Sequence, residues 1–255
     1  HRGKPSRSSC ASTLELGETC VPQNSTTNSR PPSPHSTSNG VGTVPSARWD
    51  VSAHAGVSEA LLSRARHGGF VRGAELADNT AFAVSPAEAA AMDPCQRQIL
   101  ERGYSALHDA ALGRSALGGS LTGFFLGFSG TEFSQMLAAS PAGSSVYAAT
   151  GSSHSIACGR VSYVLGLHGP CASYDTACSA ALTAYHASLR ALQLDECSHG
   201  LAAGINLMLT PNNGTTFAIS GLTSLVGRSH TFDLRADGYA RGEACCAAAM
   251  RQAHG

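Results

Sequence analysis

Short apolar runs alternate with segments of helical periodicity through the chain, and this alternation most limits the fold. Residues 121–128 and 201–209 are apolar runs of the length of buried strands, and residues 171–175 form a shorter run. Residues 156–167 and 182–192 carry apolar side chains at three- and four-residue steps, which is typical of amphipathic helices. Strands that alternate with helices in this order predict a layered α/β fold.

Before these elements, two segments carry residues that are typical of helix N-termini. Residues 85–88 read Ser-Pro-Ala-Glu, with a hydroxyl N-cap, proline at the first helical position and Glu at the third. Residues 93–96, Asp-Pro-Cys-Gln, repeat the pattern, and an apolar stripe through Leu100, Tyr104 and Leu107 follows. The sequence therefore predicts two consecutive helices, the second of which packs one face on a partner.

Residues 175–179, Asp-Thr-Ala-Cys-Ser, join the predicted strand 171–175 to the predicted helix 182–192. A cysteine at a helix start lies beside unpaired backbone N–H groups, which favour its thiolate and can also bind an oxyanion. Cys178 is therefore a candidate nucleophile. On spacing alone, a buried structural thiol explains the same residue equally well.

The run 175–179 resembles the active-site signature of β-ketoacyl synthases of the polyketide and fatty-acid type, and four further blocks of the chain are similar to that family in the same order. These blocks are residues 84–97, 150–151, 159–163 with 167–170, and 232–243. With them, the resemblance covers most of the chain from Trp49 onward and favours the nucleophile over the structural thiol.

The resemblance implies a thiolase-like fold, with α-β-α-β-α layers in the complete family and mainly the N-terminal half here. It implies an acyl-transferring condensing domain that loads an acyl chain on Cys178 for decarboxylative condensation with a malonyl-type extender. Both substrates would be thioesters on the phosphopantetheine of an acyl carrier protein, with no cofactor bound to the domain. The family's two histidines are expected beyond residue 255, so we expect this chain alone not to complete a condensation.

The resemblance also implies a homodimer in which the strand 171–175 pairs with its twin across a two-fold axis. A catalytically silent homologue that serves as a dimerisation or scaffold element is the alternative function. The retained Cys178 motif favours the enzyme, and the missing histidines favour the silent homologue.

The N-terminal segment departs from the family pattern. Residues 1–46 are dominated by Ser, Thr, Pro, Asn and Gly, and we expect them to be a disordered tail. Synthases open with an apolar strand before the region of Trp49, so the strand is expected to be lost here. Residues 47–255 are then a partial ketosynthase domain.

Charge and cysteine content exclude several other classes. Lys plus Arg and Asp plus Glu are balanced at 17 each, so no basic field favours nucleic acid. The 9 cysteines are scattered and odd in number, which favours a reducing intracellular compartment, with the cytoplasm as the default. No apolar run reaches the roughly 20 residues of a membrane span.

Metal and nucleotide sites are not expected. His168, Cys171 and Cys178 lie near one another in sequence, but no Cys-x-x-Cys pair supports a zinc site. The glycines lack the spacing of a phosphate loop or a dinucleotide fingerprint. We interpret Asp175 as a local hydrogen-bonding residue and Glu243 as a buried structural carboxylate.

Overall fold

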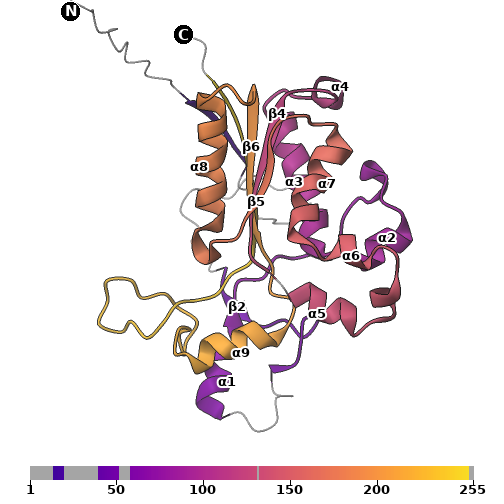
Figure 1. Cartoon of the computed structure of the whole chain (residues 1–255). Helices are drawn as coiled ribbons and strands as arrows, with labels where there is room; N and C mark the ends of the chain where they lie inside the picture. The colour runs from indigo at the N-terminus through magenta and orange to yellow at the C-terminus, as the bar shows by residue number, and fades with distance from the viewer. Residues whose placement is uncertain (1–13, 20–39, 52–57, 131, 253–255) are drawn as a thin grey trace, which may run out of the picture.

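The computed structural model describes residues 14–19, 40–51, 58–130 and 132–252. Its centre is a five-stranded mixed sheet with strand order β1-β7-β6-β4-β5 (Figure 1). The strands are β1 (Leu14–Thr19), β4 (Thr122–Phe128), β5 (Cys171–Tyr174), β6 (His199–Asn206) and β7 (Ala244–Gln252). β4 runs parallel to both β5 and β6, whereas β7 is antiparallel to β6 and to β1.

Helices cover both faces of this sheet. α3 (Pro94–Asp109) and α7 (His154–Leu165) pack on one face, and α8 (Ala180–Gln193) packs on the other (Figure 1). All seven residues of β4 are buried between these layers. The layered α/β architecture predicted from the alternation of strands and helices is therefore confirmed.

Shorter elements surround the ends of the sheet. The remaining helices are α1 (Glu59–Ala65), α2 (Pro86–Ala91), α4 (Arg114–Leu117), α5 (Glu132–Ala138), α6 (Ala148–Gly151) and α9 (Pro211–Ile219). β2 (Gly42–Thr43) and β3 (His67–Gly68) form a small antiparallel pair, and 3₁₀ turns span Thr80–Phe82, Pro141–Ser144 and Ala177–Ser179. No helix in the described ranges is long and apolar enough to cross a membrane.

The two predicted helix starts are confirmed in α2 and α3. The Ser85 hydroxyl accepts a hydrogen bond from the Glu88 N–H at 3.2 Å, and an Asp93 carboxylate oxygen accepts one from the Cys95 N–H at 2.7 Å. Each proline stands in the first turn, where a missing N–H costs no intrahelical bond. In a capping box the Glu88 side chain would turn back to the Ser85 N–H, but here it pairs with Arg160.

The stripe predicted on α8 is only partly correct. Leu192 is buried, but Leu182 is 70% exposed, and the other residues that α8 buries are small: Ala180, Ala184, Ser188 and Ala191. The sheet opposite presents Gly127, Gly200 and Gly204, where an added Cβ would overlap atoms of α8. The helix therefore lies too close to the sheet for large side chains at most positions of its inner face.

Part of the segment expected to be a disordered tail forms regular structure. Within residues 1–46, residues 14–19 form the edge strand β1 and residues 42–43 form β2. Residues 1–13 and 20–39 of the predicted tail lie outside the described residues. Residues 211–214 open α9, because Pro211 suits the first helical position.

Candidate active site

Cys178 lies in a tight 3₁₀ turn, Ala177–Ser179, between β5 and the start of α8. Asp175 accepts a hydrogen bond from the Ala177 N–H at 3.1 Å, and the Ser179 hydroxyl donates to the Thr176 carbonyl at 2.9 Å. Ala177 has a φ of 53°, a left-handed conformation that costs an L-residue about 1–2 kcal/mol. The turn leaves the Cys178 side chain exposed at the head of the helix.

Two glycines let the start of α8 approach the sheet. A Cβ on Gly127 of β4 would overlap the backbone of Ala180 and Ala181, and one on Gly204 of β6 would lie 2.5 Å from the Ala181 Cβ. The helix therefore begins directly above the carboxyl ends of the two strands. This contact fixes the position of Cys178 relative to the sheet.

Cys178 opens into a groove of about 520 Å³. The groove is walled by the ends of β4 and β6, the turn before α8 and the start of that helix, one residue of α9, and the start of β7 with the segment before it. Its lining residues are Gly127, Ser129, Ala177, Cys178, Ala180, Ala181, Gly204, Ile205, Asn206, Phe217, Tyr239, Ala240, Arg241, Gly242, Ala244 and Cys246. Most of these side chains are apolar or small, and the described lining contains no histidine. Such a wall suits an acyl chain better than a charged ligand.

The wall at residues 239–242 is held by the buried carboxylate of Glu243. Its oxygens accept hydrogen bonds from the N–H groups of Val71 at 2.7 Å and Met208 at 2.8 Å, and they pair with Arg48 at 2.9 Å. Burial raises the pKa of Glu243, although these bonds oppose the shift. The carboxylate therefore joins three separate segments, in agreement with its interpretation as a structural residue.

A second polar centre joins the other blocks that carry the family resemblance. The buried Gln96 amide donates to the carbonyls of Thr150 at 3.1 Å, Gly151 at 3.0 Å and Ser153 at 3.2 Å. Its oxygen accepts from the Arg160 Nε at 3.0 Å, and Arg160 in turn pairs with Glu88. Residues far apart in sequence thus meet in one network behind the sheet.

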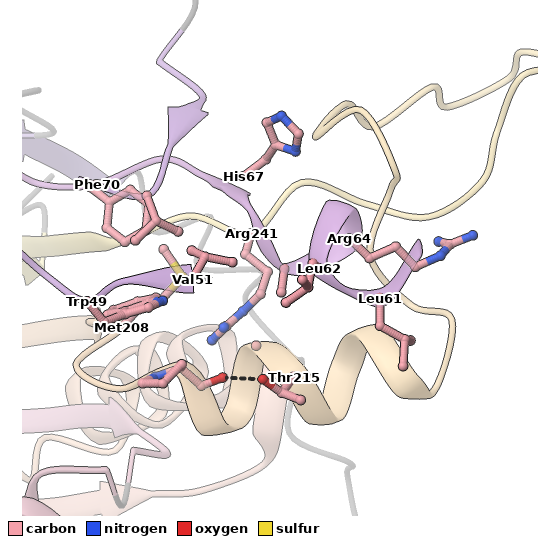
Figure 2. Close-up of a pocket in the computed structure, with 14 residues that line it drawn as sticks. Trp49, Val51, Leu61, Leu62, Arg64, His67, Phe70, Met208, Thr215 and Arg241 are labelled. Atoms are coloured by element: carbon pink, nitrogen blue, oxygen red, sulfur yellow. Dashed lines mark hydrogen bonds between the residues drawn. The ribbon is translucent and has the colours of Figure 1, made fainter. Parts of the chain in front are cut away.

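A second, smaller hollow lies between α1, β3 and α9, and Figure 2 shows the side chains around it. In that view Arg241 extends towards the first turn of α9. Its Nη1 lies 3.0 Å from the point that a Cβ on Gly214 would occupy. The Arg241 guanidinium also lies 5.1 Å from the centre of the Phe217 ring. The hollow measures about 20 Å³, room for about one water. It is a packed seam in which Arg241 secures α9 beside the groove.

The three residues that the sequence analysis singled out lie at different positions around the groove. Cys178 is on the groove, while Asp175 caps its turn and Glu243 is buried behind the wall. Within the described ranges, no three His, Cys, Asp or Glu side chains, including those of His168 and Cys171, are close enough to hold a metal. Sequence reasoning missed Cys246 and Arg241 as lining residues, because only the fold brings β7 and its leading segment beside α8.

The sequence matches the family described as "Beta-ketoacyl synthase, N-terminal domain" over residues 35–254. A phenolphthiocerol/phthiocerol polyketide synthase polypeptide of Mycobacterium tuberculosis is 42% identical over 207 residues, which are 80% of this chain and 14% of that polypeptide.

Solved structures give the same result. A ketosynthase from module 6 of the bacillaene synthase of Bacillus subtilis superimposes with a TM-score of 0.76 at 31% identity, over 84% of this chain and 35% of that one. The oxazolomycin ketosynthase domain OzmH KS7 of Streptomyces albus gives 0.73 at 32% identity, over 83% of this chain and 37% of that one. The thiolase-like layered fold is thereby confirmed, and the chain spans about a third of these ketosynthases. The chain belongs to the β-ketoacyl synthase family and carries residues of that family's N-terminal domain.

Proposed function

We propose that the Cys178 thiol accepts an acyl group from a thioester, the loading step of a β-ketoacyl synthase. The observation that carries this proposal is the exposed thiol at the head of α8, facing an apolar groove of about 520 Å³. A structural cysteine would be expected inside the core, as Cys95 and Cys197 are.

The loading step is a thiol exchange. The Cys178 thiolate attacks the thioester carbonyl carbon, and the carbonyl oxygen becomes an oxyanion. When that intermediate collapses, the new carbon–sulfur bond to Cys178 remains, the old one breaks, and the departing thiol takes up a proton. N–H groups at the start of α8 are suited to the oxyanion, and one such donor is typically worth about 3–4 kcal/mol in the transition state.

The donor proposed is an acyl chain on the phosphopantetheine of an acyl carrier protein, and the complete reaction is decarboxylative condensation with a malonyl-type extender. The decarboxylating half requires groups that hold the extender and stabilise developing charge. The described lining of the groove holds no histidine for this role. We therefore propose that this chain alone loads Cys178 and releases no condensed product.

We further propose that the chain forms a homodimer through β5. We also propose that it resides in a reducing intracellular compartment. β5 is the last strand of the sheet, so its outer edge offers backbone groups to a second copy. The described cysteines form no disulfide, which is compatible with such a compartment.

The test supplies the full chain with an acyl-carrier thioester and a malonyl-carrier thioester. We expect intact-protein mass spectrometry to find one acyl adduct on Cys178, and we expect no released carbon dioxide and no β-ketoacyl product. Cys178→Ala should abolish the adduct. Cys246→Ser is the matched control, because this second thiol lines the same groove and should be dispensable.

Three outcomes would contradict the proposal. An adduct on Cys246 or another cysteine would remove Cys178 as the acceptor. Condensed product from this chain would mean that other residues do the work of the family histidines, with His154, His168 and His186 the first to substitute. A folded wild-type chain that takes up no acyl group would favour the alternative function, a silent scaffold homologue.

A further inference from the structure

Two cysteines that the proposed acyl transfer does not use face each other across the seam between α7 and β5. The Sγ atoms of Cys158 and Cys171 lie 3.1 Å apart. Two residues further along β5, the Ser173 hydroxyl donates a hydrogen bond to the His154 carbonyl of α7 at 2.8 Å, so the same two elements are joined there as well. Because side chains alternate along a strand, Cys171 and Ser173 share the face of β5 that meets α7.

The two thiols have unequal surroundings. Cys158 is 1% exposed and its Sγ also lies 3.4 Å from the Phe124 carbonyl, whereas Cys171 is exposed at the sheet edge. The hydrogen bond between the two thiols lowers the pKa of Cys171, and the same bond together with burial raises the pKa of Cys158. Cys171 is thus the accessible member of the pair and the one whose thiolate is favoured, with a second thiol held beside it.

We propose that Cys158 and Cys171 form a reversible dithiol–disulfide pair that hydroperoxides oxidise. A disulfide bond is about 2.05 Å long, so the two sulfurs need to approach by only about 1 Å. This site is separate from the groove and requires neither acyl transfer nor Cys178.

The reaction balances with one hydroperoxide. The Cys171 thiolate attacks the terminal peroxide oxygen, the O–O bond breaks, and Cys171 becomes a sulfenic acid while the peroxide is reduced to water or an alcohol. Cys158, the resolving thiol, then attacks that sulfur, loses its proton and expels water. Both sulfurs are oxidised by one electron each, and an added dithiol returns them to thiols by exchange.

Three other described thiols are less suited to oxidation. Burial raises the pKa of Cys95 and of Cys197, and it raises the pKa of Cys245 to about 12. Cys245 and Cys246 are adjacent in β7, so their side chains point to opposite faces of the sheet. We expect the pair to react in the undimerised chain, because pairing of β5 with a second copy would cover the sheet edge at which Cys171 is exposed.

The test treats the reduced, folded chain in a Cys178→Ala background with hydrogen peroxide. Remaining thiols are alkylated under denaturing conditions, and the digest is analysed without reductant. We expect a linked peptide pair containing residues 158 and 171, lighter by two hydrogen atoms than the two thiols and lost on addition of dithiothreitol. Cys171→Ser should remove the link, and Cys197→Ser, a matched substitution at a remote buried thiol, should retain it.

A second readout separates the pair from two unrelated thiols. If Cys158 donates to the Cys171 thiolate, Cys158→Ala should slow alkylation of Cys171 by iodoacetamide at pH 7 several-fold, with circular dichroism unchanged. Unchanged alkylation would overturn the coupling. Peroxide products with Cys171 as a sulfinic acid, or joined to Cys171 of a second chain, while Cys158 stays a thiol would overturn the disulfide.

Discussion

At the scale of single residues, the surroundings of each cysteine decide its chemistry. Cys178 is exposed on an apolar groove, Cys171 is exposed on the sheet edge, and Cys158 is buried in the core beneath α7. The sequence alone predicts Cys178 as the most reactive thiol. Since the hydrogen bond to Cys158 lowers the pKa of Cys171, a simple alkylator is expected to react with Cys171 as well. An acyl thioester that must occupy the groove is therefore the more selective probe of Cys178.

Gln96 gives a prediction at the same scale. Gln96→Met keeps the size of the side chain but leaves three carbonyls and the Arg160 Nε without this partner. We expect the free energy of unfolding to fall by about 3 kcal/mol, because each buried polar group left without a partner costs about 1–3 kcal/mol. Urea denaturation followed by circular dichroism measures this loss.

Gln98→Met in the same helix is the control. Its amide donates to the carbonyls of Leu76 at 2.8 Å and Ala74 at 3.4 Å, so it has fewer and weaker bonds to lose. We expect a loss of about 1 kcal/mol for this variant. Equal losses in the two variants would mean that the Gln96 network contributes no more to the free energy of unfolding than the two hydrogen bonds of Gln98.

At the scale of elements, the separation between α8 and the sheet determines the site. Two glycines and the small inner face of α8 allow the helix to start above the ends of β4 and β6. The groove beside Cys178 exists because this helix and the segment before β7 meet at that edge. A change in the spacing of these elements should therefore alter both stability and acyl loading.

Gly204→Ala tests this dependence. The added Cβ would lie 2.5 Å from the Cβ of Ala181, so we expect a loss of about 2 kcal/mol in the free energy of unfolding and reduced acyl loading. Ala181→Gly removes the clashing atom and should restore loading, at the cost of about 1 kcal/mol for glycine in a helix. Urea denaturation and the mass of the acyl adduct are the two measurements.

Two matched substitutions accompany this experiment. Gly127→Ala overlaps the backbone of α8, so Ala181→Gly should not rescue it. Gly159→Ala in α7 meets nothing within 4 Å and should stabilise the protein by up to about 1 kcal/mol. The proposed spacing would be wrong if Gly204→Ala were as stable and as readily acylated as the wild type.

At the scale of the whole molecule, the unpaired outer edge of β5 and several exposed apolar side chains suggest association. β5 is hydrogen-bonded to β4 alone in the described sheet. Leu182 on α8 and Phe232 and Leu234 in the segment before β7 are also exposed. Such surfaces commonly mark interfaces between proteins, and they also make a chain prone to aggregate.

We expect a dimer in analytical ultracentrifugation at micromolar concentration. Pairing of β5 with its twin should protect from hydrogen exchange those amides of residues 171–174 that do not bond to β4. Dilution that dissociates the dimer should remove this protection, while the amides of the buried strand β4 serve as the internal control. A monomer at every concentration, with a well-folded spectrum, would exclude the β5 interface.

The sequence by itself determined features that depend on residues a few positions apart. The caps at Ser85 and Asp93, the buried strand near residues 122–128 and the position of Cys178 between a strand and a helix all follow from local hydrogen bonding and periodicity. These features, with the five motif blocks, were enough to predict the fold class, the family and one candidate nucleophile.

The tertiary structure alone decided which distant residues meet. The small inner face of α8, the place of Arg241 and Cys246 on the groove, and the contact between Cys158 and Cys171 all depend on how closely packed elements approach. Residues 14–19 lack an apolar run that would predict a strand. They form β1 because they pair with the backbone of β7. Spacing along the chain carries no information on these distances, because packing between layers sets them.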